Sequence, residues 1–191
     1  MALIKTSAQG LTADATNLVL LNSQTASGDT ILTFDSSLIT STYNIYELKY
    51  YNYQPETNSD ALNISLSTDN GSTYETSNMA RCVLALNSSV TNDNVTTRYG
   101  ATNSIVVQGT VWNNANANTR TGSGSVIFYD LPSSKAKKIV FDTSHIDENG
   151  LTANTRGAVG FNSSSIINNF KIYQSSGNIA QGTFSLFGVK A

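Results

Sequence analysis

The residues best suited to acid–base or metal chemistry in this sequence are His145, Asp147 and Glu148, which lie close together. Zinc sites use three or four His, Cys or carboxylate ligands, and this chain has one His and one Cys. A glycosidase would need two carboxylates from distant strands, for which Asp142 and Glu47 are further candidates. Because neither pattern is complete, the sequence predicts no catalytic residue, no metal and no cofactor. A polysaccharide-degrading enzyme is the third-ranked class of function.

Cys82 is the only cysteine, so no intrachain disulfide is possible. It lies in an apolar stretch, 79–86, where a small buried thiol is the usual role of a free cysteine. A catalytic thiolate would need a base beside it, and we expect His145 in a polar turn. Cys82 is therefore predicted to be a core residue.

The composition favours a neutral polar surface. Charged residues make up 13% of the 191 residues and the net charge is −2, whereas about a quarter of the residues of an average domain are charged. The largest basic cluster is Lys135–Lys138, which we interpret as a solvated strand start. Nucleic-acid binding would need a basic stripe, so it is not expected. Surface-displayed β proteins, viral shells and secreted carbohydrate-binding modules all have such compositions.

The first residues carry no targeting pattern. Met1–Ser7 lacks the basic and apolar regions of a signal peptide. Leu18–Leu21 is too short to cross a bilayer, so no membrane insertion is expected. Residues 1–16 are small and polar and predict an N-terminal arm or tether. A surface-type protein without an export signal would be synthesised in a host cytoplasm and released by lysis, which points to phage.

Short apolar or alternating segments separated by turn residues predict an all-β fold, with residues 17–191 as a single antiparallel β-sandwich of jelly-roll type. The clearest alternation is 61–68, with Leu62, Ile64 and Leu66 facing inward. Asp69-Asn70-Gly71 then predicts a hairpin whose return strand begins at Thr73. Long polar loops are expected at 87–103, 113–124 and 142–156.

The closing segment 182–191 is apolar on both faces of a strand. Phe184 and Leu186 point to one side and Phe187 and Val189 to the other. This pattern predicts a central strand, or a strand whose second face meets another subunit. Phe187 and Val189 are thus candidate subunit-interface residues. We expect 166–173 to pair with this strand as a hairpin through a turn at 174–178.

Two groups of aromatic and basic residues could contact a ligand. The predicted loops carry Arg98, Tyr99, Trp112 and Arg120, which could form a contact surface for a host glycan. Five tyrosines in 43–53 could form a sugar-stacking platform, but tyrosine also packs well in strands. Core and interface packing is the favoured interpretation of that segment.

Two motifs resemble a known group of proteins. The segment Ser67-Thr-Asp-Asn-Gly-Ser-Thr-Tyr74 and the ending Gly182-Thr-Phe-Ser-Leu-Phe-Gly-Val-Lys190 are similar to short virion surface proteins of tailed phages, especially marine phages. These proteins commonly have Tyr where this chain has Phe187. The resemblance covers the rest of the chain loosely.

The resemblance implies a non-enzymatic β-sandwich on the virion surface, assembled as a homotrimer, in a capsid decoration, head fibre or tail fibre. Other virion proteins, from the capsid or the tail, would be its partners, with the N-terminal arm as the candidate docking segment. It supplies no catalytic residues. The alternative function is a receptor-binding fibre tip or a carbohydrate-binding module.

Overall fold

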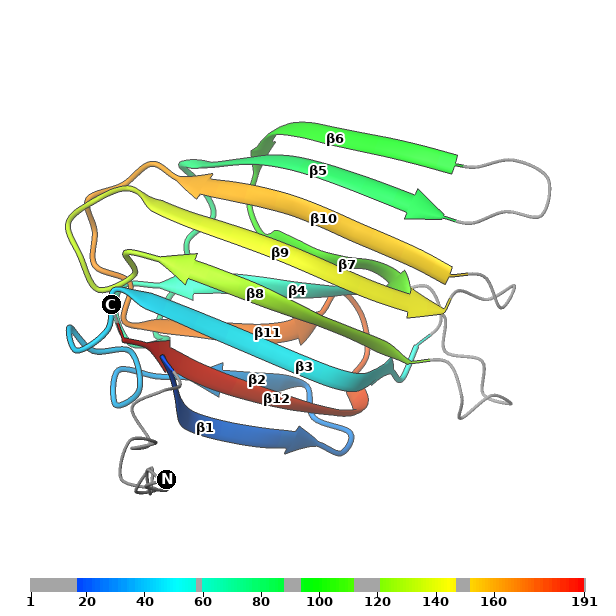
Figure 1. The fold of residues 1–191 in the computed structure, drawn as a ribbon, viewed down its shortest axis with the longest axis horizontal. Coiled ribbons are helices and arrows are strands. Elements are labelled where there is room, and N and C mark those ends of the chain that lie inside the picture. Colours follow the sequence, from blue (N-terminus) through cyan, green and yellow to red (C-terminus); the bar gives the residue numbers. More distant parts are fainter. Residues whose placement is uncertain (1–16, 58–59, 88–93, 112–120, 147–151, 191) are drawn as a thin grey trace, which may run out of the picture.

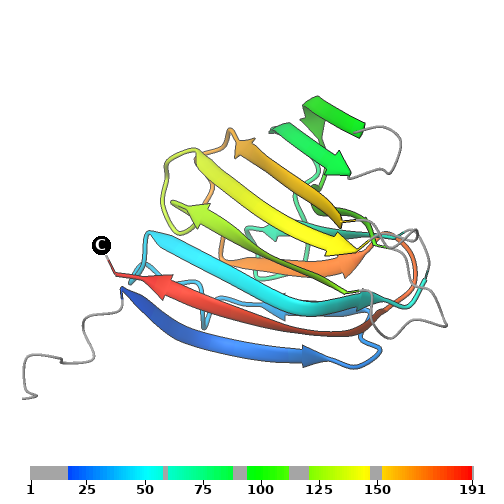
Figure 2. The same ribbon diagram turned by 45° about the vertical axis from the view of Figure 1, so that its right-hand side comes forward.

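The computed structural model describes residues 17–57, 60–87, 94–111, 121–146 and 152–190. These residues form two antiparallel sheets packed face to face (Figures 1 and 2), which confirms the predicted all-β sandwich. In spatial order, the large sheet contains β1 (Leu18–Ala26), β12 (Ile179–Val189), β3 (Ile45–Pro55), β8 (Gly122–Tyr129), β9 (Lys137–Ile146), β10 (Thr152–Phe161), β5 (Met79–Asn87) and β6 (Asn94–Thr102). The small sheet contains β2 (Ile31–Phe34), β11 (Asn169–Gln174), β4 (Asp60–Ser67) and β7 (Ile105–Val111). No helix in these ranges is long and apolar enough to cross a membrane.

The chain passes repeatedly between the two sheets. Strands β1 to β4 alternate between the large and the small sheet, and β10, β11 and β12 do the same. Two hairpins, β5–β6 and β9–β10, instead extend the large sheet. Strand β7 lies under β8, β9 and β10, so the β5–β6 end of the large sheet projects past the small one (Figure 1).

The core lies between the facing surfaces of the sheets. Phe128 of β8 stacks on Phe170 of β11 at 4.8 Å between ring centroids, and Phe170 stacks on Phe34 at 5.0 Å. Within the large sheet, Tyr50 stacks on Phe184 at 5.5 Å. All these rings are almost completely buried. Such stacked pairs contribute beyond the area they bury, and the first stack joins the two sheets.

The closing segment forms most of β12, which is paired on both sides, with β1 and with β3. Phe184 and Leu186 face the core, whereas Phe187 and Val189 lie on the other face and are partly exposed. The predicted alternation is thus confirmed. The predicted hairpin with 166–173 is wrong, because β11 belongs to the small sheet and the turn after it carries the chain across the sandwich.

The three predicted polar loops are shorter than expected. Residues 94–102 form β6, β8 begins at Gly122, β9 continues to Ile146, and β10 begins at Thr152. Asn, Gly and Ser are poor strand formers, but each of these segments completes a ladder with a neighbour. Sheet pairing therefore overrides the local preference.

Asp69-Asn70-Gly71 forms a tight turn without a return strand. Asn70 and Gly71 have φ values of 57° and 92°, the left-handed pair that such a turn requires. The Asp69 carboxylate accepts hydrogen bonds from the Ser67 hydroxyl and from the Thr73 amide and hydroxyl. These bonds hold the pKa of Asp69 at about 2. The chain then runs across the outer face of the small sheet.

A backbone irregularity in β3 changes which tyrosines reach the core. The register shifts between Tyr50 and Tyr53 in the pairing with β8, where Asn52 has a φ of 54°. Tyr53 therefore joins Tyr46 and Tyr50 on the buried face, although strict alternation would place it opposite them. Core packing is confirmed for these three side chains.

Lys137 at the start of β9 is buried, with 1% of its surface exposed. Its ammonium donates to the carbonyls of Ser133 and Lys135 at 2.8 Å each, and to those of Ser163 and Ser165. The prediction that this lysine cluster is solvated is wrong for Lys137. Its ammonium ties the β8–β9 connection to the β10–β11 connection.

The two ends of the described chain meet. The Lys190 amide donates to the Asn17 carbonyl at 2.8 Å, next to the pairing of Leu18 with Val189.

Candidate functional site

The structure describes only one of the three residues that the sequence analysis grouped for acid–base or metal chemistry. His145 is on β9, not in a turn, and is 7% exposed on the core side of the large sheet, because it follows the alternation of Phe141 and Thr143. Asp147 and Glu148 lie outside the described residues. Cys82 is exposed, which corrects the predicted core thiol, because Met79, Arg81 and Val83 occupy the inner face of β5 and Cys82 therefore points outward.

The other carboxylates considered for catalysis are in ion pairs on the outer face of the large sheet. Asp142 lies 2.8 Å from the Arg156 guanidinium, and Glu47 lies 3.4 Å from the Lys49 ammonium. Hydrogen bonds from Asn154 and then from Arg156 lower the pKa of Asp142. Within the described ranges no group of three or more His, Cys, Asp or Glu residues could hold a metal ion.

The predicted loop contact surface is only partly described. Trp112 and Arg120 lie outside the described residues. Arg98 and Tyr99 lie in β6, paired with Val83 and Cys82, and not in a loop. Tyr99 is 84% exposed, whereas for Arg98 only the backbone is described. The joint role of these four residues in binding stays a prediction.

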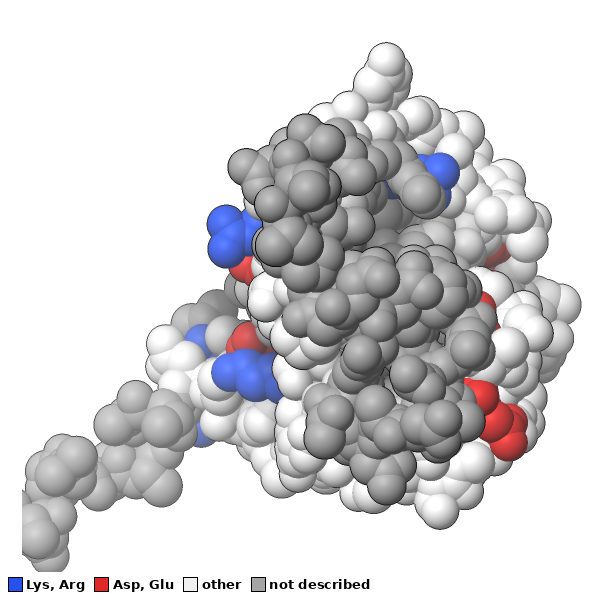
Figure 3. Space-filling model, turned by 90° about the vertical axis from the view of Figure 1, so that its right-hand side faces the viewer, with Lys and Arg blue, Asp and Glu red and all other residues white. Residues whose placement is uncertain are grey.

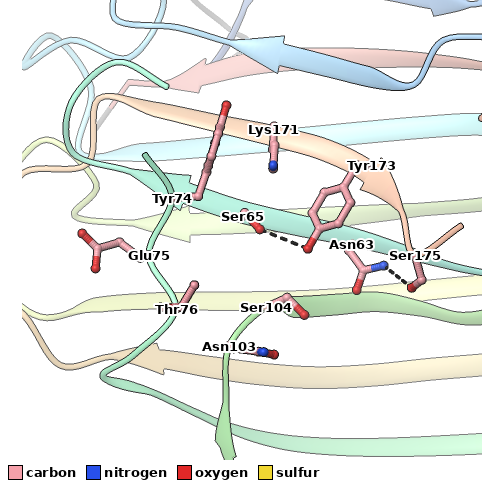
Figure 4. A pocket seen from close by; sticks show the side chains of 10 residues that line it. All are labelled: Asn63, Ser65, Tyr74, Glu75, Thr76, Asn103, Ser104, Lys171, Tyr173 and Ser175. Carbon is pink, nitrogen blue, oxygen red and sulfur yellow. Dashed lines mark hydrogen bonds between the residues drawn. The ribbon is translucent and has the colours of Figure 1, made fainter. Parts of the chain in front are cut away.

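A polar cleft of about 370 Å³ lies on the outer face of the small sheet (Figure 4). Its floor comes from neighbouring strands, because Lys171 pairs with Ser65 and Tyr173 pairs with Asn63. Alternation turns all four side chains away from the core, into which Ile64, Leu66, Phe170 and Ile172 point. Strands β4 and β11 thus position the floor of the cleft.

The walls of the cleft come from two connections. One is the segment after the Asp69 turn, with Tyr74, Glu75 and Thr76, and the other is Asn103 and Ser104 before β7. The Glu75 amide donates to the Leu66 carbonyl at 2.8 Å, which holds the first wall against β4. Ser65 points away from the core, and this wall helps to bury it, so that only 5% of its surface is exposed.

Hydrogen bonds fix the side chains of the cleft. The Ser65 hydroxyl donates to the Tyr173 hydroxyl at 3.2 Å, and Asn63 Nδ2 donates to the Ser175 hydroxyl at 2.9 Å (Figure 4). Burial and the nearby Asp69 raise the pKa of Tyr74, while a hydrogen bond to Thr33 of β2 opposes them. Tyr74 therefore remains neutral at physiological pH and acts as a hydrogen-bonding ring.

Lys171 lies between two aromatic rings. Its ammonium is 4.0 Å from the ring centroid of Tyr74 and 4.8 Å from that of Tyr173. Within the described part of the chain it makes no ion pair. Cation–π contacts of this kind hold the ammonium in place and leave its N–H groups available to donate hydrogen bonds to oxygen acceptors.

Sequence reasoning did not find this cleft. The alternation in 61–68 correctly turned Asn63 and Ser65 away from the core. The sequence does not show that β11 pairs with β4, or that the segment with Tyr74 lies over these two strands. Both features depend on tertiary contacts.

A second surface of interest is the outer face of the large sheet. One row of directly paired outward residues crosses the whole sheet: Leu20, Phe187, Glu47, Ile127, Val140, Ala158, Cys82 and Tyr99. The next row contains Leu18, Val189, Ile45, Tyr129, Lys138, Gly160, Ala80 and Ala101. Both rows are mainly apolar.

Several apolar residues of these rows are well exposed, with Leu20 at 56% and Val140 at 42%. Phe187 is partly shielded by Lys49, whose ammonium lies 5.7 Å from its ring centroid. The candidate interface residues Phe187 and Val189 occupy neighbouring rows on this surface, which we call the outer apolar face. A continuous apolar surface on one side of a sheet is typical of an interaction site.

Few charges are visible among the described atoms at the end of the molecule in Figure 3. The surface there is mostly uncharged, with scattered acidic and basic residues. This distribution agrees with the low charge content of the sequence.

No protein-family model matches this sequence, and no curated protein is significantly similar to it. The resemblance to phage virion proteins therefore rests on the two sequence motifs.

Proposed function

We propose that this chain is a non-enzymatic structural protein of a tailed-phage virion, displayed at the particle surface as a homotrimer. The observation that carries the proposal is the outer apolar face, with two mainly apolar rows across the large sheet. Large exposed apolar patches mark interaction sites, and a subunit can bury such a face against its neighbours. The two phage-like motifs supply the virion context.

The strand order supports a jelly-roll interpretation of the sandwich. Strands β1, β12, β3 and β8 form one half of the large sheet, and β2, β11, β4 and β7 form the small sheet. Every connection between these eight strands crosses from one set to the other, except that from β4 to β7, which are neighbours in the small sheet; β5–β6 and β9–β10 are added hairpins. This arrangement of eight strands in two sheets is the one expected of a jelly roll, a fold of viral capsid and lectin domains.

The oligomeric state tests the proposal directly. Native mass spectrometry of the wild-type chain at micromolar concentration should detect three chains together. A charge at the centre of the outer apolar face, Val140→Glu, should shift the population to monomer without lowering the melting temperature of the monomer. Ser144→Glu, on the same strand and face but outside the two apolar rows, is the matched control and should remain trimeric.

A wild-type chain that is monomeric at micromolar concentration would refute the assembly part of the proposal. The virion part needs its own measurement. The chain should appear in purified particles by mass spectrometry, and its fold should fit density on their surface by cryo-electron microscopy.

A further inference from the structure

The lining of the small-sheet cleft restricts the chemistry of any ligand. Its ten lining residues are Asn, Ser, Thr, Tyr, Lys and Glu, with no aliphatic side chain. An apolar ligand would find no apolar walls there apart from the faces of two phenol rings. The cleft instead offers amides, hydroxyls and one ammonium, which together donate and accept hydrogen bonds.

The donors and acceptors are held in place before a ligand arrives. Ser65 and Asn63 are 5% and 4% exposed and are fixed by their bonds to Tyr173 and Ser175. Tyr74 and Tyr173 hold the ammonium of Lys171. Fixing polar groups in advance lowers the entropy cost of binding, and few well-placed polar groups are typical of small-molecule sites.

The charges in the cleft argue against an anion. Lys171 is the only cation in the lining, and Glu75 is the only acidic residue there, with its carboxylate directed away from Lys171 (Figure 4). Among the described residues, the Glu75 carboxylate accepts a single long hydrogen bond, 3.5 Å, from the Thr68 hydroxyl, so it can accept further hydrogen bonds. A phosphate or sulfate would therefore meet a single ammonium and no second cation, so the lining does not select an anion.

We propose that this cleft binds a neutral saccharide, with one or two sugar rings in contact with the protein. Sugar hydroxyls both donate and accept, and the C–H face of a sugar ring packs against phenol rings such as Tyr173. The volume of about 370 Å³ lies at the lower end of the range for small-molecule sites. The assignment is independent of trimer formation, because the cleft and the outer apolar face lie on opposite sides of the sandwich.

A glycan array that carries neutral hexoses, N-acetylhexosamines, uronic acids and sialic acids tests the proposal. The wild-type chain should retain at least one neutral glycan, whose affinity is then measured by isothermal titration calorimetry. Lys171→Met keeps the stem of the side chain against the rings and removes the ammonium, and it should weaken binding at least tenfold. Asn103→Trp places a bulky ring in the cleft from an exposed position and should abolish binding without touching the core.

The matched controls are Lys135→Met in the β8–β9 connection and Tyr51→Ala on the large sheet, which change an exposed lysine and an exposed tyrosine outside the cleft. Both should bind the glycan like wild type, and all variants should show wild-type melting curves. Failure to retain any neutral glycan would overturn the proposal, as would retention of acidic glycans only. Undiminished binding by the Lys171→Met and Asn103→Trp variants would also overturn it.

Discussion

Four backbone carbonyls, rather than a carboxylate, surround the buried ammonium of Lys137. A methionine of similar length would leave these carbonyls without their donor, and an unsatisfied buried polar group costs about 1–3 kcal/mol. We expect Lys137→Met to lower the free energy of unfolding by more than about 2 kcal/mol, as measured by urea titration. Its exposed neighbour gives the control, because Lys138→Met should stay within about 0.5 kcal/mol of wild type. Equal effects of the two substitutions would contradict this role.

Asp69 should make the fold sensitive to acid. Its pKa is about 2 in the folded chain, below the ordinary value of 3.8, so folding favours the ionised form. The stabilisation is therefore complete above about pH 4 and is lost as the pH falls through 2. The urea midpoint should fall between pH 6 and pH 2.5, and Asp69→Asn should reduce that fall. Identical acid profiles for the two proteins would show that the turn does not depend on the carboxylate.

Strand β12 carries two phenylalanines with opposite surroundings, which form a matched pair. Phe184 is fully buried against Tyr50 and Tyr53, whereas Phe187 lies on the outer apolar face. Phe184→Ala should cost about 3–5 kcal/mol of stability, measured by chemical denaturation. Phe187→Ala should cost about 1 kcal/mol or less in the monomer and should instead weaken trimer formation. A large loss of monomer stability from Phe187→Ala would argue against the interface assignment.

The strand elements show what the sequence could and could not predict. Alternation correctly placed Leu62, Ile64 and Leu66 in the core. It also correctly divided the side chains of the closing segment between the two faces of its strand, because both patterns depend only on the period of a strand. The hairpin predicted between β11 and β12 failed because a short turn can also lead to the facing sheet. Local sequence does not distinguish these two paths.

The same limit explains the candidate sites. The carboxylates near His145 were grouped by sequence distance alone, and the structure places His145 on the core side of a strand. The cleft on the small sheet brings together residues from 63 to 175 that are distant in sequence. The pairing of β4 with β11 and the two connections that form the walls place them together, and no short-range pattern records these contacts.

At the scale of the whole molecule, the first and last described strands are neighbours, and the Asn17–Lys190 hydrogen bond brings the two ends together. The first and last described residues are therefore close enough to be joined by a short linker. Joining residues 17 and 190 through a short flexible linker should leave the sandwich undisturbed while restricting the unfolded chain. In the chain-entropy model, closing a loop of this length stabilises the fold by roughly 5 kcal/mol at most.

A head-to-tail cyclised chain should accordingly melt at a higher temperature than the same chain with its linker cleaved, as measured by calorimetry. No gain would mean that closure strains the junction. The same proximity makes the domain suitable for circular permutation, since new ends could be opened at a turn between two strands while the old ones are joined. It also suits insertion into a loop of another protein, because its two attachment points would occupy a single site on the host.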